Sequence, residues 1–128
     1  MAPTMERKIM PKLGKTISNV IRGDTRKVNL TFLDTDGSTA IDLTGGTVYF
    51  TVQSSSDPTN DTTALMFQKT ATSFTSATTG KHTFTLTHAD TDIAAGTYWY
   101  DAQFVDSTGS YLSSYRGKFV VQSDTTRT

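Results

Sequence analysis

The chain has 128 residues and a mass of 13.9 kDa, which suits one domain able to bury a two-layer core without metals or disulfides. It contains no cysteine, which excludes a disulfide scaffold, a thiolate nucleophile and a cysteine-based zinc site. The formal net charge is zero, so the chain has no general attraction to nucleic acid or membranes. Roughly a fifth of the residues are threonine, which favours strands over helices and predicts an all-β protein.

Residues 1–16 are predicted to form an extended basic arm, because they contain two prolines and no alternating pattern. Residues 1–27 carry a net charge of +5, and the other residues carry −5. No apolar run is long enough for a signal peptide or a membrane span. The apolar residues within the arm favour an assembly role over a solvated tail, with expected contacts through Arg7, Lys8, Ile9, Met10, Lys12, Leu13 and Lys15.

The first strand is predicted over residues 25–32, where apolar and polar side chains alternate. Residues 34–37 (DTDG) predict a tight turn, which makes a hairpin with the following strand the simplest interpretation. That strand is predicted over residues 47–52, with valine and phenylalanine on one face. The polar residues 54–63 around an Asp-Pro pair predict a loop.

Residues 64–69 and 72–75 predict short or edge strands, with Met66 or Phe67 pointing inward. Residues 81–87 alternate again and predict another strand.

After that strand, Thr87 and Asp90 have the spacing of a capping box at the start of one helical turn. The strongest strand pattern follows over residues 98–105. Tyr98 is the candidate for a tyrosine corner, a tyrosine whose hydroxyl bonds back to the preceding backbone, and Tyr100 takes the core position two residues later.

The last predicted hairpin turns at residues 106–109 and returns through residues 110–121. Gly117 is expected to permit a β-bulge there.

About seven strands with turns every 8 to 12 residues predict an immunoglobulin-like antiparallel β-sandwich. The predicted organisation is an extended N-terminal arm over residues 1–16, a sandwich over residues 17–124 and a tail over residues 125–128. Residues expected to serve the fold itself, through turns or core positions, are Gly23, Gly37, Gly46, Gly96, Tyr98 and Tyr100.

Four segments also carry a family resemblance: residues 22–25 (RGDT), 34–37 (DTDG), 41–50 (IDLTGGTVYF) and 96–101 (GTYWYD). Together they resemble the immunoglobulin-like N-terminal domain of the upper baseplate proteins of tailed bacteriophages and of related short phage structural proteins. The resemblance runs from about Ile17 to Val121. It implies a part of a virion.

No catalytic residue is predicted, because nothing places a nucleophile beside either of the two histidines. His82 shares a strand face with Phe84, which assigns it to the sheet or its rim. His88 falls in the helical turn, where it is expected to cap the turn or face water. Asp90 and Asp92 diverge within one turn and are expected to provide charge at the helix end.

Two short motifs are rejected as binding sites. Asp34 and Asp36 match the opening of a calcium-binding loop, but its twelfth position would be Gly45 instead of a glutamate. Residues 22–24 (RGD) match the tripeptide that integrins recognise, but no secretion signal accompanies them. The backbone freedom of Gly23 explains the motif.

The candidate interface is the outer face of the strand at residues 98–105, where Trp99, Asp101 and Gln103 alternate with the core positions. An outward tryptophan suggests a covering partner. The candidates are a neighbouring subunit, the chain's own arm or a sugar ring, in that order, or else a loop of the same domain.

The predicted function is that of a non-enzymatic structural component of a tailed phage particle, in the tail or baseplate, assembled in the host cytoplasm. The expected partners are other virion proteins and copies of the chain itself in a symmetric assembly. No cofactor, metal, small-molecule substrate, membrane or nucleic acid is expected.

Two alternatives stay open: a capsid decoration or cement protein, and a carbohydrate-binding β-sandwich module. The upper baseplate protein continues beyond this domain, whereas this chain ends after it, so the precise place in the particle also stays open.

Overall fold

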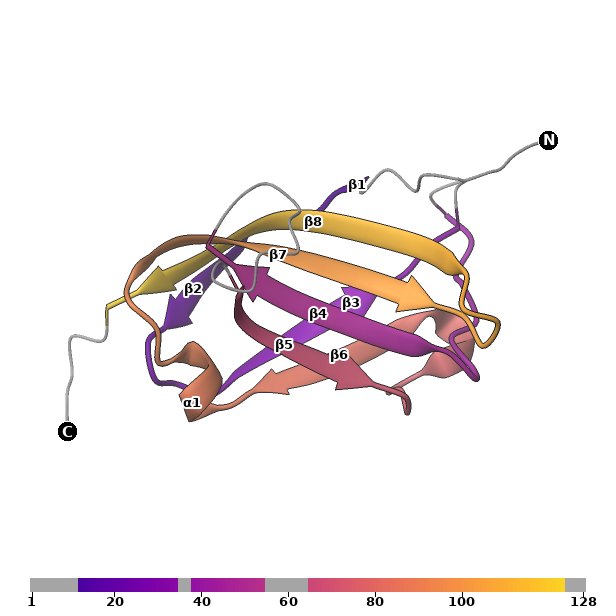
Figure 1. Ribbon diagram of the computed structural model, residues 1–128, viewed down its shortest axis with the longest axis horizontal. Coiled ribbons are helices and arrows are strands. Elements are labelled where there is room, and N and C mark those ends of the chain that lie inside the picture. Colours follow the sequence, from indigo (N-terminus) through magenta and orange to yellow (C-terminus); the bar gives the residue numbers. More distant parts are fainter. Residues whose placement is uncertain (1–11, 35–37, 55–64, 124–128) are drawn as a thin grey trace.

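The computed structural model describes residues 12–34, 38–54 and 65–123 (Figure 1). These residues form an all-β sandwich of about seven strands with one short helix. The elements in chain order are β1 (Lys12–Leu13), β2 (Ile17–Ile21), β3 (Arg26–Thr31), β4 (Thr47–Gln53), β5 (Leu65–Ala71), the 3₁₀ turn η2 (Ala77–Thr79), β6 (Lys81–Leu86), α1 (His88–Thr91), β7 (Gly96–Val105) and β8 (Tyr111–Gln122).

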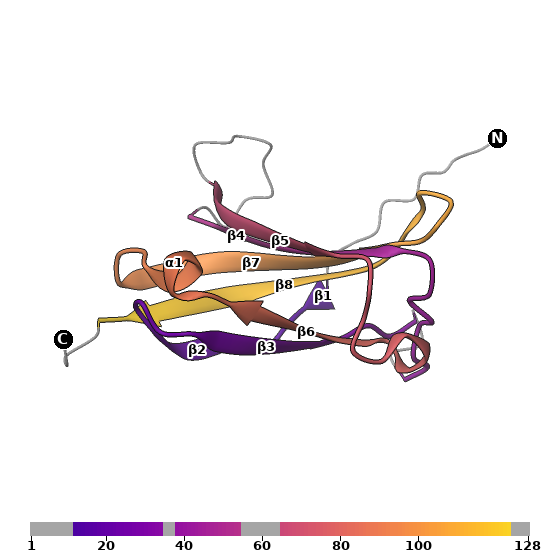
Figure 2. The same ribbon diagram turned by 90° about the horizontal axis from the view of Figure 1, so that it is seen from below.

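The strands form two sheets that lie face to face (Figure 2). The larger sheet has the order β1-β8-β7-β4-β5, and β2 also pairs with β8. Both β1 and β2 run parallel to β8 and follow one another along the same edge of it. The smaller sheet contains β3 and β6, which pair antiparallel.

This strand order is that of an immunoglobulin-like domain. In that fold the strands named B and E pair in one sheet, while C, F and G are neighbours in the other. Here β3 pairs with β6, and β4, β7 and β8 are neighbours, so these five strands take the places of B, E, C, F and G in turn. The predicted all-β sandwich of about seven strands is confirmed, but its pairing is not wholly antiparallel, since β1 and β2 run parallel to β8.

The core lies between the two sheets and is centred on Phe50 of β4, which is fully buried. Its ring lies 5.5 to 6.4 Å, between ring centroids, from four other aromatic rings. Those rings belong to β5, β6, β7 and β8, so every strand around Phe50 contributes to one cluster: Phe67, Phe84, Tyr100 and Phe119. The alternation predicted for residues 47–52 is confirmed by the buried positions of Val48, Phe50 and Val52.

The predicted hairpin between the strands at residues 25–32 and 47–52 is wrong. β3 pairs with β6, and the chain after β3 crosses to the other sheet before β4 begins. The only local pairing described on this connection is the bridge between Leu33 and Ala40. Consecutive strands that belong to opposite layers cannot share a ladder of hydrogen bonds, although each has the same alternating pattern.

Three smaller expectations also need correction. Residues 72–75 are not a strand, since β5 ends at Ala71. The side chain that turns inward on β5 is Phe67, whereas Met66 is 36% exposed. The pairing of β7 with β8 is regular at Gly117, opposite Tyr100, and its irregularity lies at the other end, beside Val105.

The predicted boundary between arm and sandwich at residues 16 and 17 is also wrong. β1 lies on the edge of β8, and the Gly14 N–H donates a hydrogen bond of 2.6 Å to the Arg116 carbonyl. The Tyr100 hydroxyl donates to the Lys15 carbonyl at 2.8 Å. The sandwich therefore includes residues 12–16, because backbone groups of this segment form hydrogen bonds with β8 and with Tyr100.

The remaining predicted arm contacts, Arg7, Lys8, Ile9 and Met10, lie outside the described residues, as do Gly37 and the predicted tail.

Candidate functional site

The outer face of the larger sheet holds the three predicted interface residues. On β7, Tyr98, Tyr100, Ala102 and Phe104 are buried, and the residues between them are half-buried on the opposite face. Trp99, Asp101 and Gln103 therefore share one side of a strand that has neighbours on both edges.

Trp99 is partly covered by its own domain. It lies opposite Lys118 of β8 and Gln53 of β4 in the sheet. The Lys118 ammonium lies over the indole, 5.8 Å from the ring centroid, which is the geometry of a cation–π contact. Lys118 thus covers part of the indole, which stays partly exposed.

Polar side chains surround this tryptophan. The Gln103 amide donates to the Asp101 carboxylate at 3.0 Å, and Asp101 lies opposite Arg116 of β8 in the sheet register. The Gln68 amide of β5 donates to the Thr51 hydroxyl of β4 at 2.9 Å. The face therefore carries hydrogen-bonded amides, hydroxyls and charges together with two aromatic side chains, Trp99 and Tyr49, the second of which lies opposite Gln103.

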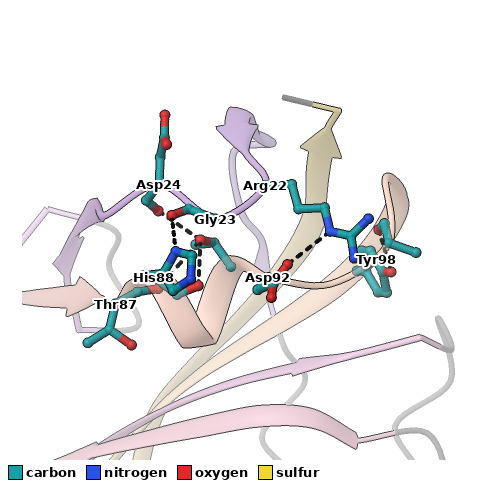
Figure 3. A network of polar contacts seen from close by, with 9 residues as sticks. Arg22, Gly23, Asp24, Thr87, His88, Asp92 and Tyr98 are labelled. Atoms are coloured by element: carbon teal, nitrogen blue, oxygen red, sulfur yellow. Dashed lines mark hydrogen bonds and ion pairs between the residues drawn. The ribbon is translucent and has the colours of Figure 1, made fainter. Parts of the chain in front are cut away.

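The turn between β2 and β3, which contains the RGD tripeptide, is attached to helix α1 (Figure 3). The Arg22 guanidinium forms an ion pair of 3.0 Å with Asp92, and the Gly23 carbonyl lies 2.6 Å from the Nδ1 atom of His88. The buried Thr91 hydroxyl donates to the Asp24 carbonyl at 2.7 Å. These contacts thus join two connections at the same end of the sandwich, the β2–β3 turn and helix α1 (Figure 1), while the Asp24 carboxylate points away from the helix.

The two histidines make different contacts. His88 contacts the turn just described. His82 lies on β6 between the rings of Phe74 and Phe84 and accepts a hydrogen bond from the Thr75 N–H at 3.3 Å. Burial lowers the pKa of the His82 imidazole. These contacts place neither imidazole ring beside a nucleophilic side chain. Packing within the fold explains the position of both rings.

Asp90 and Asp92 diverge, as the sequence predicts. Asp92 reaches Arg22, whereas Asp90 turns back to complete a capping box with Thr87 and pairs with Lys69 of β5 at 2.9 Å. Burial raises the pKa of Asp90, but the hydrogen bonds from Thr87 and Lys69 outweigh it and leave the pKa below its ordinary value.

The Asp90→Asn variant is expected to lower the free energy of unfolding by about 1–2 kcal/mol at neutral pH, since it removes a charged partner of Lys69 and weakens the cap. The ionised Asp90 stabilises the fold above the pKa of the unfolded chain, and this contribution disappears as the pH falls through the lower folded value. The difference between the two proteins should therefore begin to shrink near the ordinary aspartate pKa of about 4 and vanish only at a pH below the lower folded pKa of Asp90. Urea unfolding at several pH values measures it.

The matched control is Asp92→Asn, because Asp92 is more exposed, at 46% of its side chain. Its expected loss is under about 0.5 kcal/mol. Equal losses for the two variants would contradict the role assigned to Asp90.

The Tyr98 hydroxyl donates to the Ala94 carbonyl at 2.6 Å, the contact expected of a tyrosine corner. Tyr100 is buried in the core, and burial raises its pKa to about 12. Both tyrosines therefore have structural roles.

Sequence reasoning missed how closely residues 14–16 lie against the larger sheet. A side chain on Gly117 would lie 2.9 Å from the Gly14 carbonyl and 3.1 Å from the Lys15 carbonyl. Gly117 thus allows the two backbones to approach, and Gly14 leaves room for the rings of Tyr100 and Tyr115. The available signal is Gly117 inside an otherwise strong strand pattern, which predicts a bulge but equally fits a close approach of a second backbone.

Among residues 12–34, 38–54 and 65–123, no group of three or more His, Asp or Glu side chains is placed to hold a metal ion. No helix in the same ranges is long and apolar enough to cross a membrane. No protein-family model matches the chain, and no curated protein is similar enough to count as a relative.

Proposed function

We propose that the chain is a non-enzymatic structural component of a tailed phage particle, acting through contacts with other virion proteins. The sequence motifs that resemble the upper baseplate domain support the assignment of the chain to a phage particle. The observation that supports the mode of action is the outer face of β7, where Trp99, Asp101 and Gln103 lie in a line on the larger sheet.

This face suits protein binding because it is organised before any partner arrives. β7 is paired along both edges, and Lys118 holds one side of the Trp99 ring. A partner would therefore order few side chains on binding, which lowers the entropic cost of association. Tryptophan is also among the residues whose truncation most often costs binding energy at interfaces.

The Trp99→Ala variant is expected to incorporate into particles at least tenfold less than the unchanged chain. Losing a tryptophan anchor at an interface costs about 2 kcal/mol or more, which corresponds to about thirtyfold in affinity. The measurement is the copy number of the chain in gradient-purified particles, determined by quantitative mass spectrometry. Heads and tails purified separately report whether the chain belongs to the tail or decorates the capsid.

The matched control is Thr85→Ala, an exposed position on β6 in the other sheet. Thr85→Ala should unfold at nearly the same temperature as the unchanged chain, and Trp99→Ala at a somewhat lower one, because the indole is partly buried. Thermal melting checks that both variants are folded at the assembly temperature, so that incorporation reports the interface and not folding. Particles that contain none of the unchanged chain would contradict the proposed function. Normal incorporation of the Trp99→Ala variant would contradict this face as the contact.

The N-terminal segment is tested by removing residues 1–11 and not 1–16, because residues 12–16 are held by β8 and Tyr100. This variant should fold and lose incorporation if the segment contributes to assembly. Binding of purified unchanged chain to bacterial surface glycans, abolished by Trp99→Ala, would instead favour the carbohydrate-binding alternative.

A further inference from the structure

A groove of about 710 Å³ opens on the side of the sandwich, between the edges of the two sheets. One wall is the N-terminal segment from Gly14 to Ile17, and the other is β3, all six of whose residues line it. The rings of Tyr100 and Tyr115 also line the groove. This volume lies in the usual range for a binding site.

The β3 wall is an unpaired sheet edge among the described residues, since β3 pairs only with β6. In an antiparallel ladder the peptide groups point alternately toward the partner strand and away from it. The Phe32 N–H donates to the Gly80 carbonyl, in line with the β6 ladder. By alternation the peptide groups of Lys27, Asn29 and Thr31 point away from β6 into the groove, where the Lys27 carbonyl also accepts a hydrogen bond of 3.3 Å from the Arg26 side chain.

The two walls are held at a set distance. The Arg26 guanidinium on β3 donates to the carbonyls of Ser18 and Asn19 at 2.9 and 3.1 Å, which ties the end of β3 to β2. Tyr115 on β8 is hydrogen-bonded to the Thr31 backbone near the other end. The groove is therefore present before any ligand binds.

The charge of the groove is one-sided. Lys15, Arg26 and Lys27 line it, and none of the described residues that line it is acidic. Within the described part of the chain, none of these three cations forms an ion pair. Positive side chains on an edge strand oppose pairing with the β3 edge of a second copy, which carries the same charges.

We propose that this groove binds an extended acidic segment of a partner protein by β-strand addition to β3. The segment would form main-chain hydrogen bonds with the Lys27 N–H and the Asn29 peptide group and direct alternate acidic side chains toward Lys15 and Lys27. Its intervening small apolar side chains would lie toward Tyr100 and Tyr115. That the partner is a protein rests on the proposed function. The position of the binding site rests on the groove.

The test uses the full chain labelled with ¹⁵N and a capped ten-residue peptide that alternates aspartate and valine. Expected results are a Kd below about 1 mM, slowed exchange of the Lys27 and Asn29 amides, and weakening at high salt. Two matched probes separate the components of binding: a lysine–valine peptide, which tests charge, and an aspartate–valine peptide N-methylated along one edge, which tests strand addition. Each is expected to bind at least tenfold more weakly.

The matched protein variants are Lys27→Glu, inside the groove, and Lys81→Glu, an exposed position outside it. Both change the net charge equally, and equal melting temperatures confirm that both fold. Lys27→Glu should weaken peptide binding at least tenfold, and Lys81→Glu less than twofold.

The proposal is overturned if the acidic peptide does not bind at 1 mM, if N-methylation leaves binding unchanged, or if the protected amides lie elsewhere. Preferential binding of a ten-residue oligothymidine, which would identify the groove as a nucleic-acid site, also overturns it. Peptide binding is measured on the isolated chain, so its failure is distinguishable from a failure of particle incorporation.

Discussion

The Phe50→Ala variant is expected to lose about 3–5 kcal/mol of unfolding free energy. Phe50 is fully buried, and its ring contacts aromatic rings from four other strands. Alanine would leave a cavity where both sheets meet, and four neighbouring rings cannot close it without leaving their own positions. Since a domain of this size has a total stability of about 5–15 kcal/mol, this single change removes a large part of it.

Urea unfolding followed by tryptophan fluorescence and circular dichroism measures this loss. The matched control is Thr51→Ala, the next residue on β4, which lies on the outer face and should cost about 1 kcal/mol or less. If Phe50→Ala does not fold at room temperature, Phe50→Leu removes less volume and keeps the comparison measurable. A loss below about 1.5 kcal/mol for Phe50→Ala would contradict the central position of this ring.

The Gly117→Ala variant is expected to lose about 2–3 kcal/mol and to release the N-terminal segment from the edge of β8. The added methyl carbon would lie 2.9 Å and 3.1 Å from the carbonyl oxygens of Gly14 and Lys15 and 3.0 Å from the Tyr100 ring. Backbone atoms cannot rotate away as the end of a long side chain can, so residues 14 and 15 must move. The hydrogen bond from Tyr100 to Lys15 should then be lost.

Hydrogen exchange of the Gly14 amide, which donates to Arg116, reports this release directly and should become at least tenfold faster. The comparison variant is Gly109→Ala, where a methyl group meets no atom within 4 Å and only the positive φ of 88° opposes it. That change should cost about 1 kcal/mol and leave the Gly14 amide protected. Unchanged exchange in the Gly117→Ala variant would contradict the tight approach of the two backbones.

The same close approach connects stability to the groove. Gly14 and Lys15 form part of one wall, and Tyr100 contacts both the wall and the core. A change that moves residues 14 and 15 would therefore widen the groove without touching β3. Peptide binding by the Gly117→Ala variant would show whether the wall contributes to the site or only bounds it.

The sequence alone was sufficient for features that depend on neighbours within a few residues. Alternation identified the inward faces of β3, β4 and β7, because side chains of a strand point to opposite sides with a period of two. The capping box of Thr87 with Asp90 and the hydrogen bond from Tyr98 to Ala94 span three and four residues. Such contacts form between positions whose separation is set by local geometry.

Only the tertiary structure decided which strands are neighbours. Alternation assigns a side chain to a face but does not identify the strand beside it, so the sequence predicts a hairpin of β3 with β4, whereas β3 pairs with β6 in the fold. The ion pair of Arg22 with Asp92, the contact of Tyr100 with Lys15 and the groove beside β3 all join residues distant in the chain. Their positions follow from the packing of two sheets, which no single segment specifies by itself.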